Sequence, residues 1–194
     1  MSNNKKLKQD IIQKFGTPCA VIDLDIVDKN IAHLQALCDK AKLANRPHIK
    51  THKSPVLAMR QIEAGANGIT CQKLGEAEVM ARAGIEDILI ATNIIGAAKS
   101  GKLAALLRDV SLKVCADNPT SLNVYAEAGR AAGRPVTVVI ECDTGQKRSA
   151  GAGRRRVGQA AALTLGARAH ACVRRSAASG EPNSDSRTPG VHVV

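Results

Sequence analysis

Aromatic residues are almost missing from this sequence of 194 residues, which has one Tyr, one Phe and no Trp. Proteins that bind single-stranded nucleic acid stack bases on aromatic rings, so this scarcity argues against that class despite a net charge of +11. Lys and Arg also alternate with acids along the expected helices, as on a solvated surface. The core must be built from Ala, Val, Ile and Leu, which suits a buried parallel sheet.

Long apolar runs and paired cysteines are missing as well. No apolar run approaches the roughly 20 residues that a membrane span needs. The first ten residues, MSNNKKLKQD, are charged and have no apolar segment behind them, unlike a secretory signal. We therefore expect a cytoplasmic protein without a membrane partner. The six cysteines form no C-x-x-C pair and lie mostly in apolar runs, which favours buried thiols over a metal finger or a disulfide framework.

Apolar, β-branched runs recur along the chain at intervals of 20 to 27 residues. They are CAVIDL at 19–24, RPHIKT at 46–51, NGIT at 67–70, DILIA at 87–91, SLKVCA at 111–116 and VTVVIE at 136–141. The stretches between them have helical periodicity, as on the face formed by Val27, Ile31, Leu34 and Cys38. Strands joined by helices rather than hairpins are parallel, with right-handed crossovers.

Capping residues predict where these helices begin and end. Asp25 is expected to cap the first helix, and Asn118 followed by Pro119 is typical of an N-cap and the first helical position. Glycines are expected just past three helix ends, at Gly65, Gly84 and Gly129.

Two folds satisfy this pattern, a doubly wound sheet and a (β/α)₈ barrel. No G-x-G-x-x-G follows the first run, so the main marker of a dinucleotide-binding sheet is missing. Polar residues follow the runs, as at the mouth of a barrel. They include Asp23, Lys50, Gln72, Asn93, Asp117 and Asp143. We predict an α/β protein with a partial TIM-type barrel of about six βα units over residues 17–148, after a lead-in at 1–16.

The heptapeptide PHIKTHK at 47–53 is the most informative motif. Strand alternation places His48 and Lys50 on one face, with Ile49 on the other. If that face points inward, desolvation and a cationic neighbour such as His52 or Arg148 favour the neutral amine of Lys50, the form that attacks an aldehyde. The alternative is that this lysine lies on the surface where a strand ends.

Several segments together resemble one enzyme family. AVIDLD after Thr17-Pro18, then RPHIKTHK, GITCQKLGEAEVMARAGIEDILIATNII and ECDTGQKR, are similar to the alanine racemase N-terminal barrel of fold-type III pyridoxal-phosphate (PLP) enzymes. Within that group the similarity is to D-threonine aldolases, D-serine dehydratases and 3-hydroxy-D-aspartate aldolases, over residues 17–148. The resemblance implies that Lys50 forms a Schiff base with PLP and that Arg148 lies near the cofactor's phenolic oxygen. Gln72 is a further expected cofactor contact. His52 either assists proton transfer or supports Lys50, and we favour support.

The activity that this resemblance implies is that of a PLP-dependent lyase of D-3-hydroxy amino acids. Such an enzyme cleaves the Cα–Cβ bond or eliminates the β-hydroxyl group, and the sequence leaves this choice open. The family forms homodimers and uses a divalent metal (Mn, Mg or Zn), whose ligands we do not find here. The alternative from another class is a non-catalytic PLP-binding barrel that carries the cofactor.

After Arg148 the composition changes. Residues 149–194 contain ten Ala, seven Arg and six Gly, with no Ile, Lys or aromatic residue. A frame change near codons 148–150 would give this composition, and the alternative is a genuine Arg-rich tail with its own partner. We expect this segment to be poorly ordered, without a barrel strand, and the chain to be an inactive or impaired fragment. The H-x-C triplet of His170 and Cys172 is interpreted as coincidental rather than as a metal motif.

Overall fold

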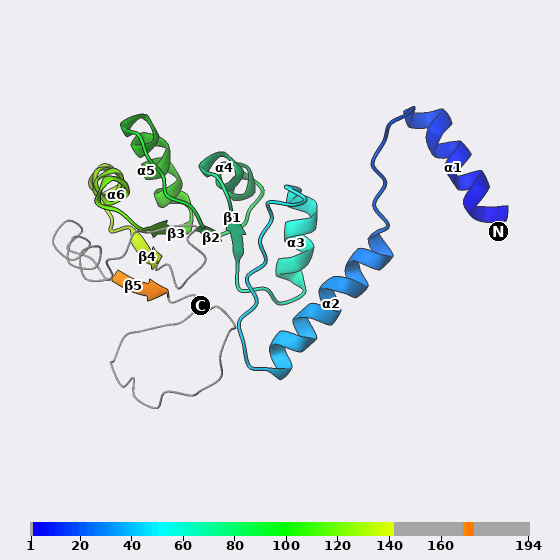
Figure 1. The fold of residues 1–194 in the computed structure, drawn as a ribbon, viewed down its shortest axis with the longest axis horizontal. Helices are drawn as coiled ribbons and strands as arrows, with labels where there is room; N and C mark the ends of the chain where they lie inside the picture. Colours follow the sequence, from blue (N-terminus) through cyan, green and yellow to red (C-terminus); the bar gives the residue numbers. More distant parts are fainter. Residues whose placement is uncertain (1, 142–168, 173–194) are drawn as a thin grey trace.

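The computed structural model describes residues 2–141 and 169–172 (Figure 1). Within these ranges five strands form one parallel sheet in the order β1-β2-β3-β4-β5. They are β1 (Ile69–Cys71), β2 (Asp87–Ile90), β3 (Ser111–Ala116), β4 (Thr137–Glu141) and β5 (Ala169–Cys172). Each strand lies beside the next one in sequence, so the order never reverses as it does in a doubly wound sheet. The sheet is therefore part of a barrel wall, as predicted.

The helices of the described chain are α1 (Ser2–Phe15), α2 (Leu24–Lys40), α3 (Pro55–Glu63), α4 (Leu74–Arg82), α5 (Ser100–Asp109) and α6 (Pro119–Ala132), with a short 3₁₀ helix η1 (Ala97–Lys99) before α5. The first three precede β1, whereas α4, α5 and α6 follow β1, β2 and β3 and cover one face of the sheet (Figure 1). Figure 1 shows α4, α5 and α6 along one side of the strands, whereas α1 and α2 extend away from them. None of the helices in the described ranges is both long and apolar enough to cross a membrane.

The core lies between the sheet and these helices. Along β2 and β4 the burial alternates, with Ile88, Ile90, Val138 and Ile140 buried and the residues between them only half buried. The buried side chains pack against Leu103 and Leu107 of α5 and Leu122 of α6. This core is aliphatic, as expected, and the other face of the sheet is the one that lines a barrel.

The first two expected strands are not regular strands. Residues 19–23 have no regular secondary structure and pair with no described strand, Leu24 begins α2, and Val21 and Ile22 are exposed. An apolar run becomes a strand only when a neighbour takes its backbone N–H and C=O groups, and no such neighbour lies beside it in the described chain. Residues 46–51 make one isolated parallel bridge, between His48 and Thr70.

Two of the expected helix boundaries need correction. Asp23 caps α2 instead of Asp25, because its Oδ1 accepts hydrogen bonds from the N–H groups of Asp25 (3.0 Å) and Ile26 (3.2 Å). Gly129 does not end α6, which continues to Ala132 and is followed by Gly133 with a φ of 69°. A Cβ atom on Gly129 would lie 3.2 Å from the carbonyl oxygen of Arg134, so close approach of the returning chain favours glycine there.

The other expected boundaries are confirmed. Asn118 Oδ1 accepts a hydrogen bond from Ser121 N (3.0 Å), and Pro119 begins α6. Gly65 and Gly84 follow the ends of α3 and α4 with φ values of 112° and 90°.

Strand β5 contradicts the expectation that residues 149–194 contain no barrel strand. It pairs in parallel with β4, from Val138 beside Ala169 to Glu141 beside Cys172. The edge of β4 offers unpaired backbone groups, which a short extended segment can satisfy without an apolar run. The rest of that segment lies outside the described residues, as do Asp143 and Arg148.

Tyr125 joins two strand ends inside the core. It is fully buried, and burial holds the pKa of its phenol above the ordinary value, so the hydroxyl stays neutral. The hydroxyl donates to the carbonyl of Cys115 (2.7 Å) and accepts from the N–H of Ile94 (3.0 Å). The residue therefore connects the end of β3 with the loop after β2.

Replacing Tyr125 by Phe should lower the free energy of unfolding by about 1–3 kcal/mol, because the N–H of Ile94 and the carbonyl of Cys115 each lose a buried hydrogen bond. Urea denaturation measures this, with Ser100→Ala as the control, since the Ser100 hydroxyl donates to Ala97 O in an exposed position (2.7 Å). Equal losses in the two variants would contradict this role for Tyr125.

Candidate functional site

Lys50 lies just past the point where its segment joins the sheet. Ile49 N donates to Thr70 O (2.9 Å), and Thr70 N donates to Pro47 O (2.8 Å). The side chain of Ile49 is fully buried, whereas Lys50 is exposed in the turn that follows. The alternation expected from the sequence is therefore correct for Ile49. This anchoring brings Lys50 to the carboxyl end of β1, where barrel enzymes carry their chemistry.

The amine of Lys50 differs from that of Lys53 in its partners. Lys53 Nζ lies 3.4 Å from Glu76 Oε1, whereas Lys50 forms no ion pair within the described part of the chain. Lys50 is also exposed, so the partly dehydrated setting expected for it is not found among these residues.

His48 was not among the predicted site residues, yet it lies directly beside Lys50. Its Nδ1 accepts a hydrogen bond from Lys50 N (3.3 Å), and the Gln72 side chain and the Thr70 backbone are close enough to influence its pKa. Burial and the positive charge of Lys50 lower the pKa of His48, against the opposing effects of Gln72 and Glu76. The imidazole is therefore neutral at pH 7. The strand alternation that pairs His48 with Lys50 is the sequence signal for it.

Gln72 directly follows the last residue of β1, at the end of the sheet where His48 and Lys50 lie. Its carbonyl accepts from Thr92 Oγ1 (2.6 Å), and its N–H donates to Glu76 Oε2 (2.8 Å). The structure thus brings Gln72, His48 and Lys50 together, since His48 accepts the N–H of Lys50 and the Gln72 side chain is close enough to act on the pKa of His48. One residue of the expected polar ring is also linked across strands, since Asn93 Oδ1 accepts from Asp117 N (3.2 Å).

Glu76 is the second residue that the sequence reasoning missed. Its Oε2 accepts from the N–H groups of Gln72 and Lys73, the latter at 3.3 Å, while Oε1 faces Lys53. Burial acts to raise the pKa of Glu76, but these hydrogen bonds and Lys53 outweigh it and hold the pKa below its usual range. The spacing from Lys73 to Glu76 is that of a capping box. The motif is hard to see in the sequence because its N-cap residue is Lys instead of the usual Ser or Thr.

The turn between Lys50 and α3 is tightly held. Lys53 has a left-handed backbone with a φ of 50°, and its N–H donates to Ile49 O (2.8 Å). Its side chain forms an ion pair with Glu76. The backbone hydrogen bond and this ion pair together hold Lys53 in a conformation that is unfavourable for a residue with a side chain.

His52 points toward α3. Its Nδ1 accepts from Ser54 N (3.0 Å), and its buried Nε2 lies near the Gln61 side chain without a well-aligned hydrogen bond. Burial lowers the pKa of His52, although contacts with Gln61 and Ser54 act to raise it. No hydrogen bond joins His52 to Lys50 within residues 2–141. These residues also contain no group of three potential metal ligands, and Arg148 lies outside them.

Glu76→Gln should remove a pH-dependent part of the stability. A carboxyl group whose folded pKa is lowered stabilises the fold above its unfolded pKa, and this is lost as the pH falls through the folded pKa. The amide can still accept from Gln72 and Lys73 but loses the charge facing Lys53, so a loss of roughly 1 kcal/mol is expected at pH 7. Urea denaturation at pH 7 and pH 3 measures it, with exposed Glu63→Gln as control. The difference from wild type should shrink at pH 3, and a constant difference would contradict this assignment.

Comparisons with known proteins agree with this geometry. Residues 22–174 match the family model "Alanine racemase, N-terminal domain", so the match continues beyond Arg148. The chain is 40% identical over 139 residues to a D-threonine aldolase of an Arthrobacter species, covering 72% of this chain and 37% of that protein. It is 40% identical over 141 residues to the D-threo-3-hydroxyaspartate dehydratase of Delftia sp. (strain HT23), covering 73% and 37%.

A solved structure shows the same fold. The crystal structure of D-threonine aldolase from Filomicrobium marinum superposes with a TM-score of 0.75 at 35% identity, covering 80% of this chain and 43% of that one. The chain thus spans less than half the length of these relatives. The parallel sheet, the lysine segment at its edge and the matched residues lead to one assignment: the chain belongs to the alanine racemase N-terminal domain family of PLP-dependent barrel proteins.

Proposed function

We propose that this chain provides the PLP-binding barrel of a lyase that acts on D-3-hydroxy amino acids, with Lys50 as the residue that binds the cofactor covalently. The observation that carries the proposal is that Lys50 is exposed and has no ion-pair partner among the described residues, on a turn whose backbone N–H donates to the neutral His48. Lys53, three residues on, is occupied by Glu76.

The residues present fit PLP at this place. A primary amine free of a carboxylate partner is the nucleophile that an aldehyde requires. When bound, the cofactor supplies an electron sink for the bonds around the substrate's Cα. Gln72 offers a neutral donor and acceptor next to the amine, and Arg148 is proposed as the fixed cation that faces the phenolic oxygen.

His48 is suited to position Lys50, because its Nδ1 accepts the backbone N–H of Lys50 (3.3 Å). Its lowered pKa leaves the imidazole neutral at pH 7 and makes it a weaker base than a lysine amine, so we assign it no proton transfer. His52 instead supports the loop, since its Nδ1 accepts the N–H of Ser54 just before α3. We therefore propose that His52 positions the loop between Lys50 and α3.

The proposed substrate class follows from what two relatives share. A D-threonine aldolase and a D-threo-3-hydroxyaspartate dehydratase both act on D-amino acids with a hydroxyl group at C3. They differ in whether the Cα–Cβ bond or the C–O bond breaks, so both reactions remain candidates. A divalent metal, a homodimer and impaired turnover of the 194-residue chain are further proposals.

Lys50 should be the one lysine that PLP labels strongly. The purified chain is incubated with PLP and reduced with borohydride, and the modified peptide is mapped by mass spectrometry. We expect labelling at Lys50 to exceed that at Lys53 by about tenfold, because an amine in an ion pair is a poor nucleophile. Lys50→Ala should abolish the main product, with Lys73→Ala, an exposed lysine nearby, as the control. Equal labelling of the exposed lysines would refute the assignment.

The reaction class is tested by assaying the chain with PLP and Mn²⁺ on D-threonine and D-serine. Each preorganised catalytic group that is lost lowers turnover by about 10²–10³. If the 194-residue chain is an impaired enzyme, its rates should therefore be near background. Turnover within about tenfold of a full-length relative would contradict impairment and support an active lyase. Binding of PLP at Lys50 without turnover of any D-3-hydroxy amino acid by the full-length protein would favour the cofactor carrier.

A further inference from the structure

Within the described part of the chain, the segment that carries Lys50 has few backbone contacts with the sheet. There it forms one isolated bridge, between His48 and Thr70, and Asn45 O accepts a hydrogen bond from Asn67 N (2.8 Å). Pro47 has no N–H to give. A segment this lightly paired needs another contact to fix its register.

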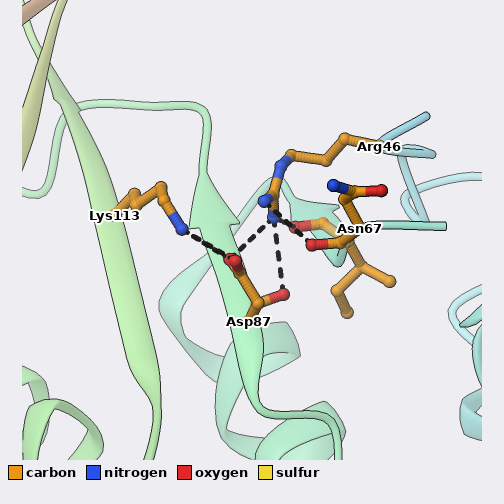
Figure 2. Close-up of polar contacts among 5 residues, drawn as sticks. Arg46, Asn67, Asp87 and Lys113 are labelled. Carbon is orange, nitrogen blue, oxygen red and sulfur yellow. Dashed lines mark hydrogen bonds and ion pairs between the residues drawn. The ribbon is translucent and has the colours of Figure 1, made fainter. Parts of the chain in front are cut away.

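Arg46 supplies that contact through its side chain (Figure 2). Its guanidinium donates to Asp87 Oδ1 (2.8 Å), to Asn67 O (3.1 Å) and to Ile69 O (3.4 Å). The side chain is only 12% exposed. One residue thus ties the Lys50 segment to the chain entering β1 and to the first residue of β2.

Asp87 is held in turn by β3. Lys113 Nζ lies 2.7 Å from Asp87 Oδ1 and 2.9 Å from Oδ2. Burial acts to raise the pKa of Asp87, but Arg46 and Lys113 outweigh it and lower the pKa. The carboxylate is therefore charged at neutral pH and joins two cations across neighbouring strands.

Gly68 makes room for this arrangement. Its φ of 132° is one that residues other than glycine rarely adopt, and a Cβ atom there would lie 2.4 Å from Arg46 Nη1 and 2.6 Å from Asp87 O. Any other residue at this position would push the guanidinium away. The chain thus combines an arginine with the one residue type that lets it approach.

We propose that Arg46 is a positioning residue for Lys50, acting from the opposite end of the same short segment. The inference rests on the proposed function of Lys50. Ile49 is buried in the core and Arg46 is clamped at the amino end, so the peptide between them has one register and delivers Lys50 beside His48 and Gln72. Lysine cannot replace arginine here, because its ammonium lacks the planar fork that reaches three acceptors on two segments.

Amide exchange tests the clamp without any cofactor. In Arg46→Met the amides of Ile49 and Thr70 should exchange about tenfold faster, since local opening is easier, while those of β3 and β4 keep their rates. Arg60→Met is the matched control, because Arg60 forms a comparable pair with Asp28 (2.6 Å) on the helices, away from the sheet. Equal acceleration throughout the sheet would show a role in global stability alone, and unchanged rates at Ile49 and Thr70 would also overturn the proposal.

Borohydride labelling then connects the clamp to Lys50. The preference for Lys50 over Lys53 should fall about tenfold in Arg46→Met and Arg46→Lys and stay unchanged in Arg60→Met, because misplacement of a reacting group is costly. If Arg46→Met does not fold, Arg46→Lys provides both measurements. Faster exchange at Ile49 with an unchanged preference would refute the positioning of Lys50. A wild-type chain unlabelled at Lys50 would refute the proposed function, and the exchange data would still decide the clamp.

Discussion

The pairing of residues 47–49 with Thr70 is the contact on which the candidate site depends. Two backbone hydrogen bonds and the buried side chain of Ile49 place the lysine segment at the edge of β1. Because parallel strands all end at the same edge, this pairing brings Lys50 next to Gln72. Without it, Lys50 would be one surface lysine among many.

Two half-buried carboxylates stabilise this pairing from opposite ends of the strands. Glu76, at the carboxyl end, accepts the N–H groups of Gln72 and Lys73 and faces Lys53. Asp87, at the amino end, joins Arg46 to Lys113. In each case hydrogen bonds and positive neighbours lower the carboxyl pKa against the cost of burial, so both stay charged at neutral pH. The site thus depends on electrostatic contacts outside the motif that first indicated it.

The interior of the fold was more predictable than its edges. The runs that form β1 to β4 are mainly apolar. β2, β3 and β4 each lie between two strands, and β1 lies between β2 and the bridge to His48. The run at 19–24 is equally apolar but has no neighbouring strand in the described chain. β5 is a short segment that pairs with the edge of β4 left open by β3. The role of Glu76 could not be predicted from the sequence, because its capping box begins with Lys73, a residue type that rarely caps a helix.

The sequence by itself determined the class of fold, the aliphatic core, the cap at Asn118 and the motif around Lys50, because these follow from local periodicity and from residue types with fixed preferences. Only the tertiary structure decided that Lys53 is paired while Lys50 has no ion-pair partner among the described residues, that His48 is neutral and that Arg46 clamps the segment to β2. These properties depend on distances between residues far apart in the chain, and no local pattern encodes such distances.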